Sequence, residues 1–154
     1  MASRDERVNP GRRLPDLALP SASGGVHRLR GGGRRSPVLV HASPCAACDA
    51  FVARLGHAAA ALREWDGEVM VVAPADGGGE PARDPGFPLL RDPEARVASA
   101  LGVRAPAVVI ADQWGEVHEA REAGEEHRFP TEAEIEQSLR YLAIQCPECQ
   151  GEAL

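Results

Sequence analysis

The sequence predicts an α/β fold with a central mixed β-sheet flanked by helices, and three observations carry this prediction. Short apolar runs at residues 38–40, 69–73 and 107–110 have the composition of buried central strands. A segment with helical periodicity separates the first two runs, and a strand–helix–strand unit favours a parallel strand pair. The third run leads into a turn and a partner strand at residues 112–117, which adds antiparallel pairing.

Composition restricts the domain organisation and the class of partner. The chain has 154 residues, of which 44% are apolar; this suffices for one compact domain and is too short to suggest two. The net charge of −6 argues against nucleic acid as a partner. We expect a flexible tail at residues 1–10, one domain at residues 11–145 and a C-terminal tail at residues 146–154.

The sequence indicates a cytoplasmic protein with no membrane partner. Residues 1–10 are polar and lack the apolar core of a secretory signal, and no stretch reaches the length of a membrane span. Because the cytoplasm is reducing, the four cysteines are better interpreted as catalytic or metal-binding residues than as static disulfides.

The first elements are a hairpin and a strand that runs into a helix. Two β-like runs at residues 14–20 and 26–29 flank a Gly-bearing turn and predict a β-hairpin extension ahead of the sheet. Ser43 is a good N-cap and Pro44 suits the first helical position, so we expect a helix over about residues 45–64. Its apolar residues recur at three- and four-residue steps and predict one buried stripe: Phe51, Val52, Leu55, Ala59 and Leu62.

The middle of the chain predicts a loop and a short helix. Residues 74–88 are rich in Pro, Gly and Asp, which is typical of a loop. Asp92 is the expected N-cap of the next helix, with Pro93 inside its first turn and Gly102 at its end.

A final helix is predicted after the last strand. Thr131 and Glu134 have the spacing of a capping box, in which each side chain satisfies a backbone N–H at the start of a helix. The expected apolar face of this helix has four members: Ile135, Leu139, Leu142 and Ile144.

The motif that carries the chemistry is a C-x-x-C pair, Cys45 and Cys48, in the expected first turn of the first helix. Two sulfurs at this spacing can close a small disulfide, and the positive end of the helix dipole favours a thiolate. Cys45, nearer to the helix end, is the expected nucleophile, and Cys48, one turn deeper, is the expected resolving thiol. Two alternatives for the pair are inert structural cysteines and a metal site.

Three segments in this order, at residues 14–17, 41–48 and 101–112, look like an entry segment, an active-site loop and a cis-proline strand. With them, about residues 10–145 resemble the thioredoxin-like superfamily. The branch that the chain resembles most is the redoxins, which include TlpA/ResA-type thiol–disulfide oxidoreductases and AhpC/TSA peroxiredoxins.

The resemblance implies a thioredoxin fold and thiol–disulfide oxidoreductase activity through Cys45 and Cys48. It also implies that Pro106 follows a cis peptide bond and that the Ala105 backbone pairs with an extended substrate peptide. The implied substrates are protein disulfides or small oxidants, and a thioredoxin-type protein is the implied electron donor. The Cys45–Cys48 disulfide is the redox centre, so we expect no further cofactor to be required.

One alternative in the same superfamily is a peroxiredoxin-like hydroperoxide reductase, with the pattern P-x-x-x-[TS]-x-x-C. If Cys48 were the peroxidatic sulfur, Cys45 would stand at the Thr position and His41 at the Pro position. The Thr hydroxyl normally orients the peroxide and a thiol is a weaker donor, so the mismatch disfavours this alternative without removing it. A non-enzymatic alternative is a zinc-binding or interaction module with the same fold.

One histidine is a candidate for proton transfer. His41 ends the strand that precedes Cys45 and is a candidate proton shuttle for its sulfur. The competing interpretation is a strand-end side chain without chemistry. The other histidines lie in no motif and are expected to be surface or hydrogen-bonded residues: His27, His57, His118 and His127.

A second C-x-x-C pair, Cys146 and Cys149, follows the last helix. It has three interpretations: a second redox pair that passes electrons to the Cys45–Cys48 disulfide, half of a zinc site completed by another chain, or an exposed pair without function. Because the last helix of the resembling fold runs away from the active site, a single zinc site using all four cysteines is disfavoured.

Overall fold

The computed structural model describes residues 12–30, 35–73, 86–92 and 94–145, and these residues form seven strands and three helices. The strands are β1 (Ala18–Pro20), β2 (Val26–Arg28), β3 (Ser36–His41), β4 (Gly67–Ala73), β5 (Leu89–Arg91), β6 (Ala107–Ala111) and β7 (Val117–Glu122). The helices are α1 (Ala46–Arg63), α2 (Arg96–Leu101) and α3 (Glu132–Ile144). The tails predicted at residues 1–10 and 146–154 lie outside the described residues, as does most of the predicted loop, residues 74–85.

Five strands form the central sheet in the order β5-β4-β3-β6-β7. β3 pairs in parallel with β4 and β4 with β5, whereas β3–β6 and β6–β7 are antiparallel. The predicted mixed sheet is confirmed. β5 was not expected as a strand, because its three residues are too few to show a period in the sequence.

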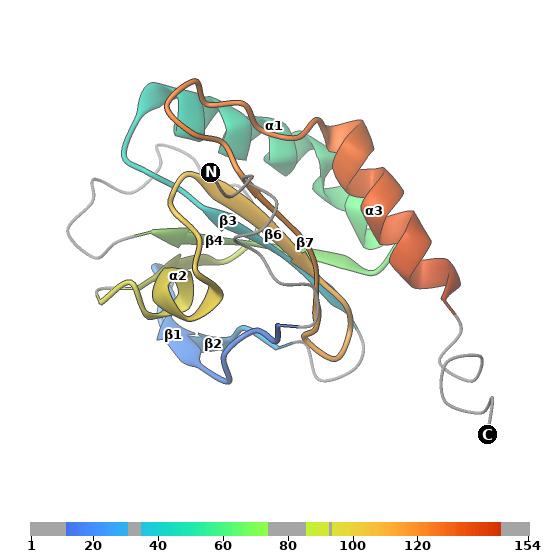
Figure 1. The fold of residues 1–154 in the computed structure, drawn as a ribbon, viewed down its shortest axis with the longest axis horizontal. Coiled ribbons are helices and arrows are strands. Elements are labelled where there is room, and N and C mark those ends of the chain that lie inside the picture. The colour runs from blue at the N-terminus through green and yellow to red at the C-terminus, as the bar shows by residue number, and fades with distance from the viewer. Residues whose placement is uncertain (1–11, 31–34, 74–85, 93, 146–154) are drawn as a thin grey trace, which may run out of the picture.

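The predicted N-terminal hairpin is also confirmed. β1 and β2 pair antiparallel, with Leu19 opposite His27. Backbone hydrogen bonds attach the N-terminal segment to the central sheet and its β6–β7 turn: Ala22 N–H donates to Leu89 O at 2.8 Å, Leu14 N–H to Gly115 O at 2.7 Å and Val117 N–H to Arg12 O at 2.6 Å. Figure 1 shows the hairpin and α2 on one side of the sheet and α1 with α3 on the other.

Alternation along the strands produces two apolar cores. Val38 and Val40 of β3 face α1 and α3, and Leu39 between them faces α2 and the hairpin. We call these two sides of the central sheet the α1 face and the α2 face. The stripe predicted for the first helix lies buried on the α1 face, and only Ala59 of its members is absent from the apolar cluster there.

The predicted helix boundaries were right at some ends and wrong at others. The capping box of Thr131 and Glu134 is present at α3, but Ile144 is 74% exposed because it lies on the last turn, past the sheet. α2 begins at Arg96 with Ala95 as its N-cap, so the predicted N-cap at Asp92 is wrong, and Pro93 lies outside the described residues. Asp92 still satisfies this helix end, since its carboxylate accepts from the N–H groups of Arg96 and Val97, both at 2.9 Å.

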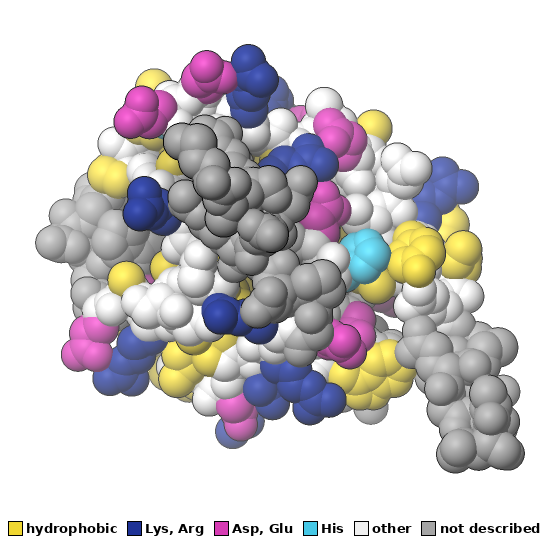
Figure 2. All heavy atoms as spheres, viewed as in Figure 1, with side chains coloured by type: hydrophobic (Ala, Val, Ile, Leu, Met, Phe, Trp, Pro, Cys, Tyr) yellow, Lys and Arg dark blue, Asp and Glu magenta, His cyan; other side chains and the backbone are white. Residues whose placement is uncertain are grey.

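Charged side chains of both signs are mixed on the surface shown in Figure 2. Several form exposed ion pairs, such as Arg96 with Glu94 at 2.8 Å and Arg128 with Glu126 at 2.8 Å. Exposed pairs of this kind contribute little stability. Burial of the two apolar cores therefore provides most of the free energy that stabilises the sheet against its covering layers.

Candidate active site

Three chain segments meet at one end of the central sheet. The strand register places His41 of β3 opposite Ala107 of β6, and Ala107 opposite Glu122 of β7. The segment that leaves β3 carries Cys45, the segment that enters β6 carries Pro106, and the loop that leaves β7 covers residues 123–130. Positions far apart in the sequence are therefore brought together by the sheet order.

Cys45 is the N-cap of α1, and its own sulfur is the capping group. The Cys45 backbone is extended (φ −150°, ψ 159°), and Sγ accepts a hydrogen bond from the Cys48 N–H at 3.4 Å. The predicted cap, Ser43, is wrong by two residues, because strand pairing continues past β3: the Ala42 N–H donates to Val72 O at 3.0 Å. This places the sulfur at the positive end of the dipole of an 18-residue helix.

Cys48 lies beneath Cys45 and is only 1% exposed, whereas Cys45 is of intermediate exposure. The Sγ of Cys48 accepts a hydrogen bond from the Ser43 N–H at 3.3 Å. Burial raises the pKa of Cys48 to about 11, and the Ser43 hydrogen bond opposes that rise. Cys48 is therefore a protonated thiol at neutral pH, shielded from solvent, while Cys45 is the sulfur that a substrate can reach.

His127 is the third member of the site and was missed in the sequence. Its Nε2 lies 3.4 Å from Cys45 Sγ, and its Nδ1 lies 2.9 Å from the carbonyl oxygen of Glu125. Because a carbonyl can only accept, Nδ1 carries the hydrogen, and Nε2 of the neutral ring presents a lone pair to the sulfur. No local motif marks His127; the order of the strands is the signal that could have indicated it.

The loop that carries His127, residues 123–130, is held on both sides. Ala123 N–H donates to Pro106 O at 2.8 Å, which ties the loop to the segment that enters β6. The Phe129 ring stacks on Phe51 of α1, with centroids 4.2 Å apart and planes 8° apart. In Figure 1 this loop passes over the N-terminal end of α1 before entering α3.

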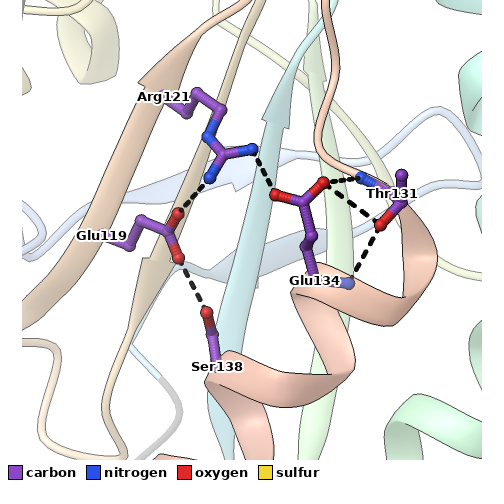
Figure 3. A network of polar contacts seen from close by, with 5 residues as sticks. All are labelled: Glu119, Arg121, Thr131, Glu134 and Ser138. Atoms are coloured by element: carbon purple, nitrogen blue, oxygen red, sulfur yellow. Dashed lines mark hydrogen bonds and ion pairs between the residues drawn. The ribbon is translucent and has the colours of Figure 1, made fainter.

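A polar network closes the base of the same loop, where β7 meets α3 (Figure 3). Arg121 of β7 donates to Glu134 at 2.7 Å and to Glu119 at 3.1 Å, and Ser138 donates to Glu119 at 2.7 Å. Arg121 lowers the pKa of Glu134, which keeps this carboxylate ionised within the capping box. The two ends of the loop are thus joined, which limits where His127 can lie.

Ala105 and Pro106 lie at the same end of the sheet. The peptide bond between them is cis, Ala105 is exposed and Pro106 is buried. Their predicted role in binding a substrate peptide stays a prediction.

His41, the predicted proton shuttle, is 3% exposed, and its Nε2 has no hydrogen-bond partner in the described part of the chain. Alternation along β3 puts its side chain on the α2 face with Leu39. Burial lowers the pKa of His41 to about 4, and the nearby charge of Asp92 opposes this. His41 is therefore neutral at physiological pH, and the contact with Cys45 that we expected of it is made by His127.

Metal-binding potential lies in the same cluster. The sulfurs of Cys45 and Cys48 and a ring nitrogen of His127 all lie within 4.8 Å of one another. Cys146 and Cys149 lie outside the described residues, so the zinc predicted there stays a prediction.

Comparison with known proteins identifies the fold. No family model matches the chain, and no curated protein does. A putative thioredoxin from Neisseria meningitidis is similar, with a TM-score of 0.72 and 20% identity over 94% of this chain and 97% of its own. A putative thiol:disulfide interchange protein DsbE from Chlorobium tepidum has a TM-score of 0.66 and 20% identity over 86% and 99% of the two chains.

A third similar structure is peroxidoxin BcpB from Mycobacterium tuberculosis, with a TM-score of 0.68 and 20% identity over 90% of this chain and 99% of its own. At such identities the likeness shows the fold, and the predicted thioredoxin fold is confirmed. In the described ranges, no helix combines the length and the apolar character that a membrane span needs.

Proposed function

We propose that this protein is a thiol–disulfide oxidoreductase in which Cys45 attacks and Cys48 resolves. The observation that carries the proposal is the pairing of a reachable sulfur at the N-cap of α1 with a buried thiol one turn deeper. Cysteines that merely fill space are inert when both are buried, whereas here one is presented and the other is held behind it.

The reaction transfers two electrons from the two thiols to a substrate disulfide. Cys45 Sγ passes its proton to Nε2 of His127 and attacks one substrate sulfur; the other substrate sulfur leaves and takes that proton. Cys48 then attacks Cys45 Sγ, giving its proton to the second departing sulfur. The products are the Cys45–Cys48 disulfide and two substrate thiols. A thioredoxin-type dithiol donor would return the protein to its reduced form.

The test uses the reduced full chain and a small peptide disulfide. The unaltered protein should release two thiols and lose two hydrogens in mass as its own disulfide forms. Cys48→Ser should stop at a stable mixed disulfide on Cys45, and Cys45→Ser should react at the background rate. A Cys146→Ser/Cys149→Ser double variant is the matched control and should behave like the unaltered protein. Full activity of Cys45→Ser, or its loss in the control, would contradict the proposal.

The hydroperoxide reductase alternative needs a different reacting sulfur from the one its pattern suggests. At 1% exposure, Cys48 is a poor target for peroxide, so Cys45 would have to form the sulfenic acid. Labelling of sulfenic acid after a peroxide pulse, together with the rate of peroxide consumption, separates the two activities. Our proposal expects disulfide reduction to be much faster than peroxide reduction.

The setting of the reaction is part of the proposal. A reducing cytoplasm would keep Cys45 and Cys48 as thiols, which is the state in which they attack disulfides. Thiol trapping in intact cells tests this: the pair should be found reduced at steady state, and a permanently oxidised pair would point to an oxidising compartment.

A further inference from the structure

The cluster of Cys45, Cys48 and His127 has a donor set that suits a second task besides thiol–disulfide exchange. The imidazole nitrogen that would take up the Cys45 proton is also fixed close to two sulfurs. Two thiolates and one imidazole are ligands that zinc prefers, and sites with three such ligands leave a fourth position open.

The distances suit one zinc ion. Zinc bonds of about 2.3 Å to sulfur and about 2.0 Å to nitrogen place two donors of a tetrahedral site about 3.5 Å apart. Cys45 Sγ and His127 Nε2 are 3.4 Å apart, and none of the three donor pairs exceeds 4.8 Å. Small rotations of the side chains are therefore enough to bring all three atoms onto one ion.

The surroundings of His127 also suit a metal ligand. The Glu125 carbonyl accepts from Nδ1, which leaves Nε2 as the atom with a lone pair. Loop contacts outside the cluster, between Phe129 and Phe51 and between Ala123 and Pro106, hold this orientation. Cys45 and His127 are of intermediate exposure, so an ion can reach the cluster from solvent.

We propose that the reduced protein binds one zinc ion through Cys45, Cys48 and His127, and that oxidation of the pair releases it. The inference rests on the proposed function for its redox step. Binding displaces the two thiol protons. A disulfide substrate then takes two electrons from the bound thiolates, so that the Cys45–Cys48 bond forms and the substrate S–S bond breaks. The two substrate thiolates take protons from solvent, and the zinc ion, which has lost its two thiolate ligands, is released. Zinc would thus stay on the pair until a disulfide oxidises the two sulfurs.

The first experiment measures zinc binding by the reduced chain without air, in competition with a coloured chelator. The background is the Cys146→Ser/Cys149→Ser variant, which removes the tail as a source of ligands. We expect one zinc per chain, and loss of that zinc when a peptide disulfide oxidises the pair. No binding in this background, or equal binding by the oxidised form, would overturn the proposal.

The second experiment tests His127 as a ligand. His127→Asn suits the positive φ of 53° at this position, which asparagine tolerates, and should weaken zinc binding by about 10–100-fold or more, since changes even to groups that only orient ligands cost this much. His57→Ala, an exposed histidine on the same helix as the cysteines, should leave binding within about twofold. Circular dichroism should show that both variants are folded. Unchanged affinity in His127→Asn would overturn the three-ligand site.

The two proposals fail separately. Disulfide reduction by the zinc-free chain without any zinc binding would leave the proposed function intact and remove this inference. Zinc binding at the three residues without disulfide reduction would leave the zinc site intact and remove both the proposed function and the redox release of zinc. Protection of Cys45 from alkylation by added zinc is a further measurement that does not depend on activity.

Discussion

His41 and His127 lie in two regions that the sheet brings to the same end, and their surroundings are opposite. His41 is only four residues before Cys45, yet its side chain is sealed on the α2 face beside Asp92. His127 is 82 residues after Cys45, yet its ring touches the sulfur on the other side of the sheet. Nearness along the chain says little here, because successive strand residues point to opposite faces.

The largest expected effect concerns the sealed histidine. The unfolded chain takes up a proton at His41 near its ordinary pKa of 6.5, but the folded chain does so only near 4. Because the unfolded state binds this proton first, the free energy of unfolding should fall by about 3 kcal/mol between pH 7 and pH 4 from this group alone. The measurement is urea unfolding at both pH values.

His41→Leu should remove that part of the pH dependence, and His57→Leu, at an exposed site, is the matched control. The charge of Asp92 also acts on His41, so the difference between variant and unaltered protein is the quantity to compare. If the unfolding free energy of His41→Leu falls between pH 7 and pH 4 as much as that of the unaltered protein, the buried ring is not the cause of the pH dependence.

The next effect concerns the histidine at the sulfur. His127→Asn should lower kcat/KM for disulfide reduction by about 10²-fold, equivalent to about 2.7 kcal/mol, because the proton of Cys45 loses its acceptor. His41→Leu should change the same rate less than about threefold, since its ring makes no hydrogen bond to either sulfur through Nε2. The reverse order of effects would assign proton transfer to the strand-end histidine after all.

The smallest effect concerns the contact that holds the His127 loop on the α1 face. Phe129→Leu keeps an apolar side chain but removes the stack on Phe51, which should cost about 1 kcal/mol of unfolding free energy. Phe87→Leu changes a half-buried aromatic residue that packs on the same face outside the loop. Alkylation of Cys45 should change rate in Phe129→Leu and stay constant in Phe87→Leu; equal rates would show that the loop is positioned without the stack.

Long periodic signals made most of the fold predictable. The three apolar runs became β3, β4 and β6, the stripe of the first helix is buried, and the capping box opens α3. Short or unusual features were not predictable in the same way. β5 has three residues, and α2 starts four residues after Asp92, the carboxylate that caps it.

At the site, the sequence indicated the cysteine pair but not its partner. C-x-x-C at a helix start is a local pattern, so Cys45 and Cys48 could be assigned without a structure. The position of His127 depends on the register of β3, β6 and β7 and on a loop conformation, and the residues next to His127 in the sequence predict neither. The cap at Cys45 was missed for a chemical reason: serine is a common capping residue, and a sulfur is a rare one.

The Cys45 sulfur, which would react, is also the acceptor of the hydrogen bond that caps the N-terminal end of α1. The sulfur of a reduced cysteine is a better acceptor than a sulfur bound to a second sulfur, so oxidation would leave the Cys48 amide less well bonded. The first turn of α1 would therefore fray when the Cys45–Cys48 pair is oxidised and become more ordered when the pair is reduced. The rate of amide hydrogen exchange at Cys48 would then differ between the oxidised and the reduced protein.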